Sequence, residues 1–206
     1  MSRFIAFEGG EGAGKSTQTR LLADALRARG AEVVTTREPG GTPGAEAIRA
    51  LLLGIDGEGW HPPAEALLFA AARSDHVERL IRPSLARGAW VICDRFVDSS
   101  RAYQGGGLGL SDAEVMDLHR IGSGGLLPDL TLLITVSPHI AAQRLAARDG
   151  DAADRIGGRP EAFHAAVAAA FDRFAAAEPA RFARIDGDGS AEETHTAVLA
   201  ALGRLS

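Results

Sequence analysis

Short hydrophobic runs alternate along the chain with longer stretches in which hydrophobic residues recur at helical spacing. Several of the runs are hydrophobic throughout, which is typical of strands that helices cover on both faces. Strands that alternate with helices predict an α/β fold, here with a five-stranded parallel sheet and helices on both faces. The predicted strands are Phe4–Glu8, Glu32–Arg37, Trp90–Asp94, Thr131–Val136 and Arg181–Asp186.

The same pattern indicates how many domains to expect. No internal repeat interrupts the alternation, and no segment has the composition of a linker between domains. Residues 162–177 are rich in alanine, but Val167, Phe171 and Phe174 mark one face of a helix. The sequence therefore predicts a single domain over residues 1–206, a length at which one domain is usual.

The overall composition is ordinary for a globular protein, with 46% hydrophobic and 24% charged residues and a net charge of −5. This acidic balance argues against a protein that coats nucleic acid. No hydrophobic run approaches the roughly 18 residues that cross a bilayer, and the first residues lack a signal-peptide pattern. The lone cysteine, Cys93, fits a reducing compartment. We expect a cytoplasmic protein with no membrane or nucleic-acid partner.

The clearest motif is a phosphate-binding loop between the first predicted strand and a predicted helix. Residues 9–16 read GGEGAGKS and match G-x-x-x-x-G-K-[ST] in full. Glycines let backbone N–H groups turn toward phosphate oxygens, and the helix that follows adds its positive N-terminal end. Lys15 is predicted to reach the outer phosphates and Ser16 to hold Mg²⁺. The predicted ATP-binding residues are Gly9, Gly10, Glu11, Gly12, Ala13, Gly14, Lys15, Ser16 and Thr17.

Two carboxylates extend this motif. Asp94 ends a hydrophobic strand, where phosphate-loop proteins carry an acid that acts on Mg²⁺ or its waters, so Ser16 and Asp94 are the metal candidates. Glu11 lies inside the anion-binding loop, where a carboxylate is electrostatically costly. Either Glu11 points to solvent, or it faces a second substrate and bonds a hydroxyl or steers an arginine.

The loop alone does not separate kinases, GTPases and passive nucleotide binders. The chain contains no asparagine, which excludes the Asn-Lys-x-Asp motif that reads guanine. It is also short for a motor or a ring ATPase, and its arginines near loops suit a small-molecule kinase. A kinase of another nucleotide or of a deoxynucleoside, and a non-catalytic nucleotide-sensing module, remain alternatives.

Four further segments resemble the signatures of bacterial thymidylate kinases, in the order in which that family carries them. They are residues 36–42 (TREPGGT), 68–73 (LFAAAR), 94–96 (DRF) and 102–107 (AYQGGG). The resemblance implies a P-loop kinase fold with a short lid at about residues 144–159. It also implies ATP-dependent, Mg²⁺-assisted phosphorylation of dTMP to dTDP for dTTP biosynthesis, by a homodimer.

Residue by residue, the resemblance implies an acceptor site. Arg95 bridges the two substrates and acts in catalysis with Lys15, Asp94 and Glu11. Phe69 stacks on the base, and Arg73, four residues later on the same helical face, bonds a base carbonyl. The full implied acceptor set is Glu11, Arg37, Pro39, Arg49, Phe69, Arg73, Arg95, Ser100, Tyr103 and Gln104.

The lid is the remaining expectation. Gly12 stands where some members of the family carry an arginine, and the bacterial pattern with this glycine supplies arginines from the lid instead. We expect Arg148 and Arg155 to be these catalytic arginines. Arg144 or Arg159 can take either role. The six histidines show no metal-ligand spacing and are expected to be ordinary surface or partly buried residues.

Overall fold

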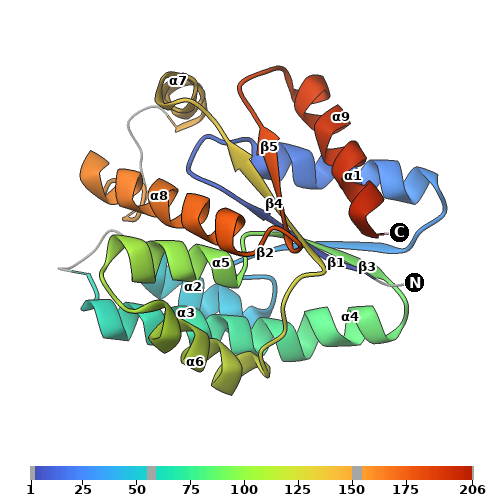
Figure 1. Ribbon diagram of the computed structural model, residues 1–206. Helices are drawn as coiled ribbons and strands as arrows, with labels where there is room; N and C mark the ends of the chain where they lie inside the picture. The colour runs from blue at the N-terminus through green and yellow to red at the C-terminus, as the bar shows by residue number, and fades with distance from the viewer. Residues whose placement is uncertain (1–2, 55–58, 150–154, 206) are drawn as a thin grey trace.

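The computed structural model describes residues 3–54, 59–149 and 155–205. Its strands form one parallel sheet in the order β2-β3-β1-β4-β5 (Figure 1). The strands are β1 (Phe4–Glu8), β2 (Val33–Arg37), β3 (Trp90–Asp94), β4 (Leu130–Thr135) and β5 (Phe182–Asp186). The five predicted strands are confirmed, each to within one residue at either end.

Helices cover both faces of the sheet, as the hydrophobic runs predicted. In Figure 1, α1 and α9 lie above the sheet, and α2 to α6 lie below it. The α-helices are α1 (Lys15–Ala28), α2 (Pro43–Leu53), α3 (Pro62–His76), α4 (Arg82–Ala86), α5 (Val97–Ser100), α6 (Asp112–Ser123), α7 (Pro138–Asp149), α8 (Glu161–Ala177) and α9 (Ala191–Ala201). The π-helical segments η1 (Val77–Ile81) and η2 (Arg101–Gly107) and the 3₁₀ turn η3 (Leu202–Leu205) complete the described elements.

The alternation of side chains across each strand divides the core into layers. Ile5 and Phe7 pack with Leu22 of α1 on one face, in a cluster that α9 also joins. Phe4 and Ala6 face the other way and pack with residues of η1 and β3. Because both faces are buried, hydrophobic side chains are favoured along β1, which explains the unbroken hydrophobic run from Phe4 to Phe7.

Local signals explain several helix boundaries. Both α6 and α9 begin with a capping box, in which a serine accepts from the backbone N–H of a glutamate and that glutamate accepts in return. The pairs are Ser111 with Glu114 and Ser190 with Glu193. Thr42 caps α2 directly before Pro43, whose fixed φ suits the first helical position.

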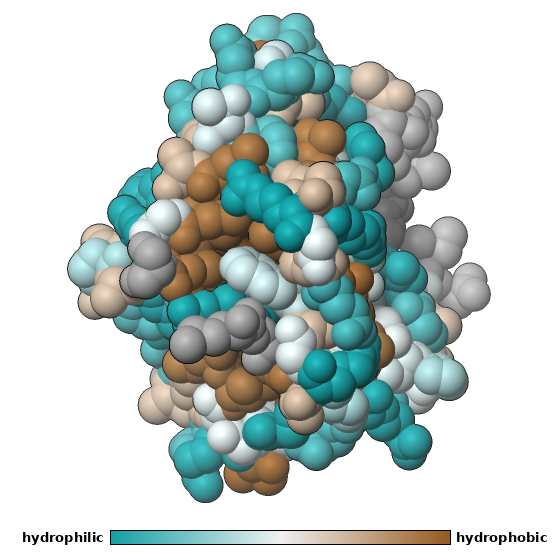
Figure 2. Space-filling model, turned by 90° about the vertical axis from the view of Figure 1, so that its right-hand side faces the viewer, coloured by the Kyte–Doolittle hydropathy of each residue, from teal (hydrophilic) through white to brown (hydrophobic). Residues whose placement is uncertain are grey.

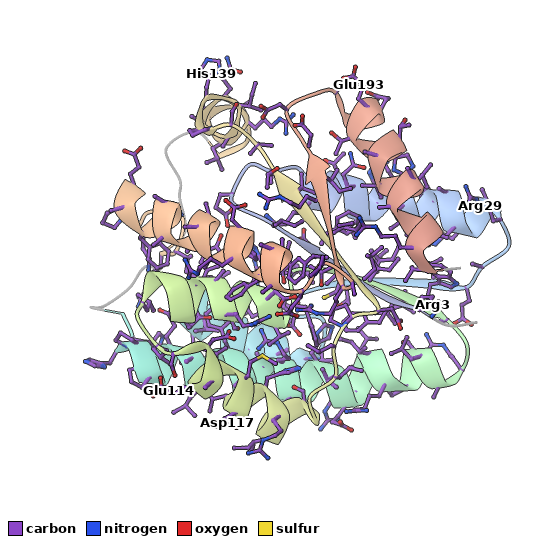
Figure 3. The ribbon with its side chains drawn as sticks, viewed as in Figure 1. Arg3, Arg29, Glu114, Asp117, His139 and Glu193 are labelled. Atoms are coloured by element: carbon purple, nitrogen blue, oxygen red, sulfur yellow. The ribbon has the colours of Figure 1, made fainter. Side chains whose placement is uncertain are left out.

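The outer surface carries the charged side chains. The labelled Arg29, Glu114, Asp117, His139 and Glu193 are exposed and point away from the core (Figure 3). Figure 2 shows the face at the right of Figure 1, where hydrophobic residues occur in patches between hydrophilic ones. Among the described residues, no helix is long and hydrophobic enough to cross a membrane.

A buried ionic cluster fixes the short helix α5 against the sheet. Asp98 is fully buried and accepts hydrogen bonds from Arg181 at 2.6 Å and from Arg101 at 3.0 Å. Thr131 of β4 also donates to its carboxylate. Burial favours the protonated carboxyl group, but hydrogen bonds from Arg181 and Arg101 and their charge outweigh it and lower the pKa of Asp98. This cluster anchors the segment that continues into η2.

We expect Asp98→Asn to lower the free energy of unfolding by about 3 kcal/mol, because it leaves two partly buried guanidinium groups short of a charged partner. The loss should be seen at neutral pH in urea unfolding. It should shrink as the pH falls below about 4, because a carboxylate with a lowered pKa stabilises the fold only while it is ionised.

Asp172→Asn is the matched control, since Asp172 pairs with Arg184 and both side chains are about half exposed. Its loss should not exceed about 1 kcal/mol. Equal losses in the two variants would contradict a special role for the buried cluster.

Candidate functional site

A cleft of about 560 Å³ opens at the carboxyl ends of β1, β2 and β3. The chain leaves β1 into α1 on one face of the sheet and leaves β3 into α5 on the other (Figure 1). Such a divergence between neighbouring parallel strands leaves a crevice, and α/β proteins bind ligands there. The cleft has two ends: the phosphate loop with the start of α1, and a set of side chains from α2, α3, α5 and η2.

The phosphate loop lies close to the end of β4 and to α7. Gly9 and Gly12 have φ angles of 138° and 72°, which favour glycine. A Cβ atom on Gly9 would lie 2.2 Å from the carbonyl oxygen of Ile134, and one on Gly12 would lie 2.8 Å from that of Ala141. Position 12 therefore has no room for the arginine that some relatives carry, unless α7 moves. Further positive charge must come from outside the loop.

The side chain of Lys15 bonds back to the start of the phosphate loop. This side chain is buried, and Nζ donates to the carbonyl oxygens of Gly9 at 3.2 Å and Gly10 at 2.6 Å. Burial, together with the charge of Arg95, lowers the pKa of Lys15 to about 8, against the opposing effect of nearby carboxylates. An anion in the loop would favour the charged form and replace these carbonyl contacts.

Ser16 and Asp94 meet at the same end of the cleft. The hydroxyl of Ser16 donates to Oδ2 of Asp94 at 2.5 Å, although the two residues are 78 positions apart in the chain. Oxygen atoms of this kind suit Mg²⁺, which usually takes one or two protein ligands and completes its shell with phosphates and water. Within the described ranges, no cluster of three or more His, Cys, Asp or Glu side chains offers an all-protein metal cage.

Arg95 lies between the two ends of the cleft. It is the residue after β3 and has a φ angle of 68°, which is unusual outside glycine. Its guanidinium pairs with Glu11, donates to the carbonyl of Gly9 at 3.0 Å and to the hydroxyl of Ser99 at 3.3 Å. It also lies over the ring of Tyr103, 5.1 Å from its centroid. The contact with Glu11 favours the arginine-steering interpretation of that carboxylate.

The far end of the cleft is aromatic and polar. Phe69 and Arg73 of α3 line it together, as their helical spacing predicted, and are 8% and 3% exposed. Phe69 also belongs to a core cluster, so the same residue packs in the core and lines the cleft. Arg73 donates to the hydroxyl of Ser100 at 2.8 Å. Gln104, at the back of the cleft, donates to Glu65 at 3.0 Å.

Two more of the predicted arginines lie at the mouth of this end. Arg37 ends β2 and pairs with Glu46 at 3.0 Å, with both side chains about half exposed. Arg49 of α2 donates from Nη1 to the carbonyl oxygen of Pro39 at 2.8 Å. Both arginines line the cleft, and so does Pro39, which also belongs to the predicted acceptor set.

The predicted lid arginines are distributed differently. Arg144 of α7 lines the cleft and donates to the carbonyl oxygens of Gly187 and Gly189. Arg159 pairs with buried Glu65. Arg155 is not part of the described cleft lining, and its guanidinium lies beside Gly59. The Arg148 side chain and residues 150–154 lie outside the described part of the chain, so the catalytic roles of Arg148 and Arg155 stay predictions.

Sequence reasoning missed a buried carboxylate directly before the phosphate loop. Glu8 is fully buried and accepts from the backbone N–H of Phe96 at 2.8 Å and from the Ser99 hydroxyl at 2.6 Å. Burial, together with the charge of Asp98, raises the pKa of Glu8. An acid at the end of a hydrophobic strand was the signal that identified Asp94, and the same signal was present here.

The expectation that all histidines are surface or partly buried is wrong for two of them. His76 is completely buried, and its Nδ1 lies 3.0 Å from Oε1 of Glu38. His119 is 1% exposed, and burial lowers its pKa to about 4. Both residues lie on helices whose buried faces receive partners from distant segments, and a single histidine gives no periodic signal of such a partner.

Comparison with known proteins gives one consistent result. A family model described as thymidylate kinase matches residues 7–198. The chain is 56% identical to the thymidylate kinase of Rhizorhabdus wittichii over 203 residues, which cover 98% of each chain. It is 49% identical to the thymidylate kinase of Caulobacter vibrioides over 195 residues, or 95% of this chain and 93% of that protein.

The fold has a solved counterpart as well. The crystal structure of thymidylate kinase from Ehrlichia chaffeensis superposes with a TM-score of 0.80 at 33% sequence identity, covering 98% of each chain. None of these relatives supports the alternatives of another nucleotide kinase, a deoxynucleoside kinase or a sensing module.

The low pKa of Lys15 predicts how nucleotide affinity depends on pH. The free protein loses the Lys15 proton as the pH rises through about 8, whereas an anion in the loop requires the charged form. Binding of Mg²⁺–ATP measured by calorimetry should therefore weaken about tenfold between pH 7 and pH 9.

Lys15→Arg provides the control, because a guanidinium stays charged throughout this range. Its affinity should be almost independent of pH, whatever its absolute value. The same tenfold loss in Lys15→Arg would assign the titration to a different group.

Proposed function

The chain belongs to the thymidylate kinase family and transfers a phosphoryl group from ATP to dTMP, and we propose that the cleft at the ends of β1, β2 and β3 holds both substrates. The observation that carries this proposal is the position of Arg95 between the phosphate loop and the Phe69–Arg73 face of α3. A group that contacts both ends of one cleft is suited to bridging two anionic substrates.

On the donor side, the loop N–H groups and Lys15 are proposed to hold the β- and γ-phosphates of ATP. Ser16 and Asp94 are the proposed Mg²⁺ residues, because their oxygen atoms meet beside Lys15. When bound there, Mg²⁺ would neutralise part of the charge that develops on the transferred group. Among the lid-segment arginines, the side chain of Arg144 lies beside the loop, with Nη1 3.8 Å from where a Cβ atom on Gly14 would stand.

On the acceptor side, no general base is required, since the phosphate of dTMP is already ionised. The difficulty is the approach of two anions, and arginines oppose their repulsion. Arg95, Arg37 and Arg49 are proposed to hold the acceptor phosphate, with Glu11 orienting Arg95. Arg37 must then exchange its exposed pair with Glu46 for the phosphate, at little cost because exposed ion pairs are weak.

The base and sugar are proposed to occupy the opposite end of the cleft. Phe69 stacks on the pyrimidine, and Arg73 donates to the carbonyl at its position 4. Tyr103 packs against C2′ of the sugar and disfavours a ribose hydroxyl there. Pro39 helps enclose the thymine methyl group, and Ser100 and Gln104 complete the polar wall.

We further infer a homodimer, a single domain and a cytoplasmic location. Leu67 and Ile121 are 56% and 74% exposed on α3 and α6, two helices that pack side by side and offer hydrophobic surface to a second copy. All described strands belong to one sheet, which supports one domain over residues 1–206. Cys93 is buried as a free thiol, as suits a reducing compartment.

A panel of nucleoside monophosphates tests the proposed function. ADP release measured in a coupled assay should be fastest with dTMP. It should be slower with ribose and purine counterparts, because the ring of Tyr103 and the Phe69–Arg73 face restrict the sugar and base. Faster turnover of AMP or GMP would refute the acceptor assignment.

Phe69→Ala tests the stacking role. Loss of one base–ring contact should raise the KM for dTMP roughly 5- to 150-fold, the range expected for about 1–3 kcal/mol of stacking, while the KM for ATP stays nearly constant. Steady-state kinetics with each substrate varied in turn measures both values.

Phe182→Ala is the comparison variant, because Phe182 belongs to the same core cluster but lies on β5, at the opposite edge of the sheet from β2. It should lower the melting temperature without raising the KM for dTMP. If Phe69→Ala behaves in the same way, the ring serves only the core.

A further inference from the structure

A buried chain of hydrogen bonds connects β2 to α3 behind the base end of the cleft. Nε2 of His76 lies 2.7 Å from the hydroxyl oxygen of Thr36, and Nδ1 lies 3.0 Å from Oε1 of Glu38. The other carboxylate oxygen of Glu38 accepts from Nε of Arg73 at 2.7 Å. The side chains of His76, Glu38 and Arg73 are 0%, 4% and 3% exposed, so water does not compete for these contacts.

These contacts fix the direction of the Arg73 guanidinium. Nε is bound by Glu38, and Nη2 donates to the hydroxyl of Ser100 at 2.8 Å and to the carbonyl of Phe96 at 3.4 Å. Among the described residues, Nη1 has no hydrogen-bond partner, and Arg73 lines the cleft. Because a guanidinium only donates, a fixed Nη1 can donate to a ligand carbonyl and disfavours a ligand amino group, which is also a donor.

The chemistry of each group determines how the chain is ordered. An ionised carboxylate only accepts, so the ring of His76 must donate from Nδ1 to Glu38. In the neutral ring Nε2 then accepts from the Thr36 hydroxyl, so both ring nitrogens have partners and the tautomer is set. With one oxygen held by His76, the carboxylate of Glu38 presents its second oxygen to Arg73 in one orientation.

We propose that Glu38 and His76 are positioning residues that hold Arg73 in the orientation that selects a pyrimidine with a carbonyl at position 4. The inference rests on the proposed function, in which Arg73 donates to the acceptor base. If His76 only fills space between β2 and α3, its loss lowers stability and leaves base selection unchanged.

Two amide substitutions separate these roles, because each keeps a different half of the imidazole. In His76→Asn the side-chain amide lies near the position of Nδ1 and can still donate to Glu38. In His76→Gln the amide lies near Nε2, so it keeps the contact with Thr36 and loses the donor to Glu38. Both amide side chains fill less of the core than the imidazole ring does, so the two variants should lose similar amounts of stability.

The readout is kcat/KM for dTMP, dUMP and dCMP, with the melting temperature and the KM for ATP measured in parallel. His76→Gln should lower the dTMP-to-dCMP ratio about tenfold or more, because Nη1 of Arg73 is then no longer held toward the carbonyl at position 4. The dTMP-to-dUMP ratio should not change, because both bases carry the 4-carbonyl. His76→Asn should keep both ratios within about threefold of the unsubstituted protein.

An unchanged dTMP-to-dCMP ratio in His76→Gln, or equal loss in both variants, would overturn the proposal. Arg73→Ala distinguishes this failure from failure of the proposed function: if it leaves the ratio unchanged, Arg73 does not contact the base at all. Should neither His76 variant fold, Glu38→Gln keeps the shape of the carboxylate and removes its charge. It should lower the same ratio, and an unchanged ratio would again overturn the inference.

Discussion

Positive charge must be buried in this cleft before any anionic ligand arrives, and each buried cation therefore needs an internal acceptor. Lys15 donates to the carbonyls of its own loop, Arg95 pairs with Glu11, and Arg73 pairs with Glu38. A buried charge without such a partner costs several kcal/mol. These partners keep the cations charged and oriented toward the cleft. The cations can still exchange these contacts for contacts with a phosphate or a base.

The fold supplies these partners from neighbouring strand ends. The strands β1, β2 and β3 end at Glu8, Arg37 and Asp94. Because β3 pairs in parallel with both β1 and β2, the carboxyl ends of the three strands lie side by side. As a result Arg95, which follows β3, contacts Glu11 and Gly9 after β1, and the backbone N–H of Glu38, which follows β2, donates to the carbonyl oxygen of Asp94. The parallel sheet brings three short, separate segments together into one charged site. Helices on both faces of the sheet exclude water from the strands beneath this site.

The two ends of the cleft differ in how rigidly they are held. The base end is backed by Glu38 and His76, both almost inaccessible to water. Arg37, at its mouth, has an exposed partner in Glu46. Selection of a base benefits from groups that do not move, whereas a phosphate that arrives and leaves requires side chains that exchange partners.

The strands, the phosphate loop and the shared face of Phe69 and Arg73 could all be predicted from the sequence, because each depends on spacing within one segment. The sequence did not reveal the pairing of Glu38 with Arg73 or with His76, which lie 35 and 38 positions away, nor the left-handed backbone of Arg95. Such contacts leave no periodic trace, since they join single side chains from different elements. Only the tertiary structure, by packing α3 against the end of β2, decided which carboxylate holds which cation.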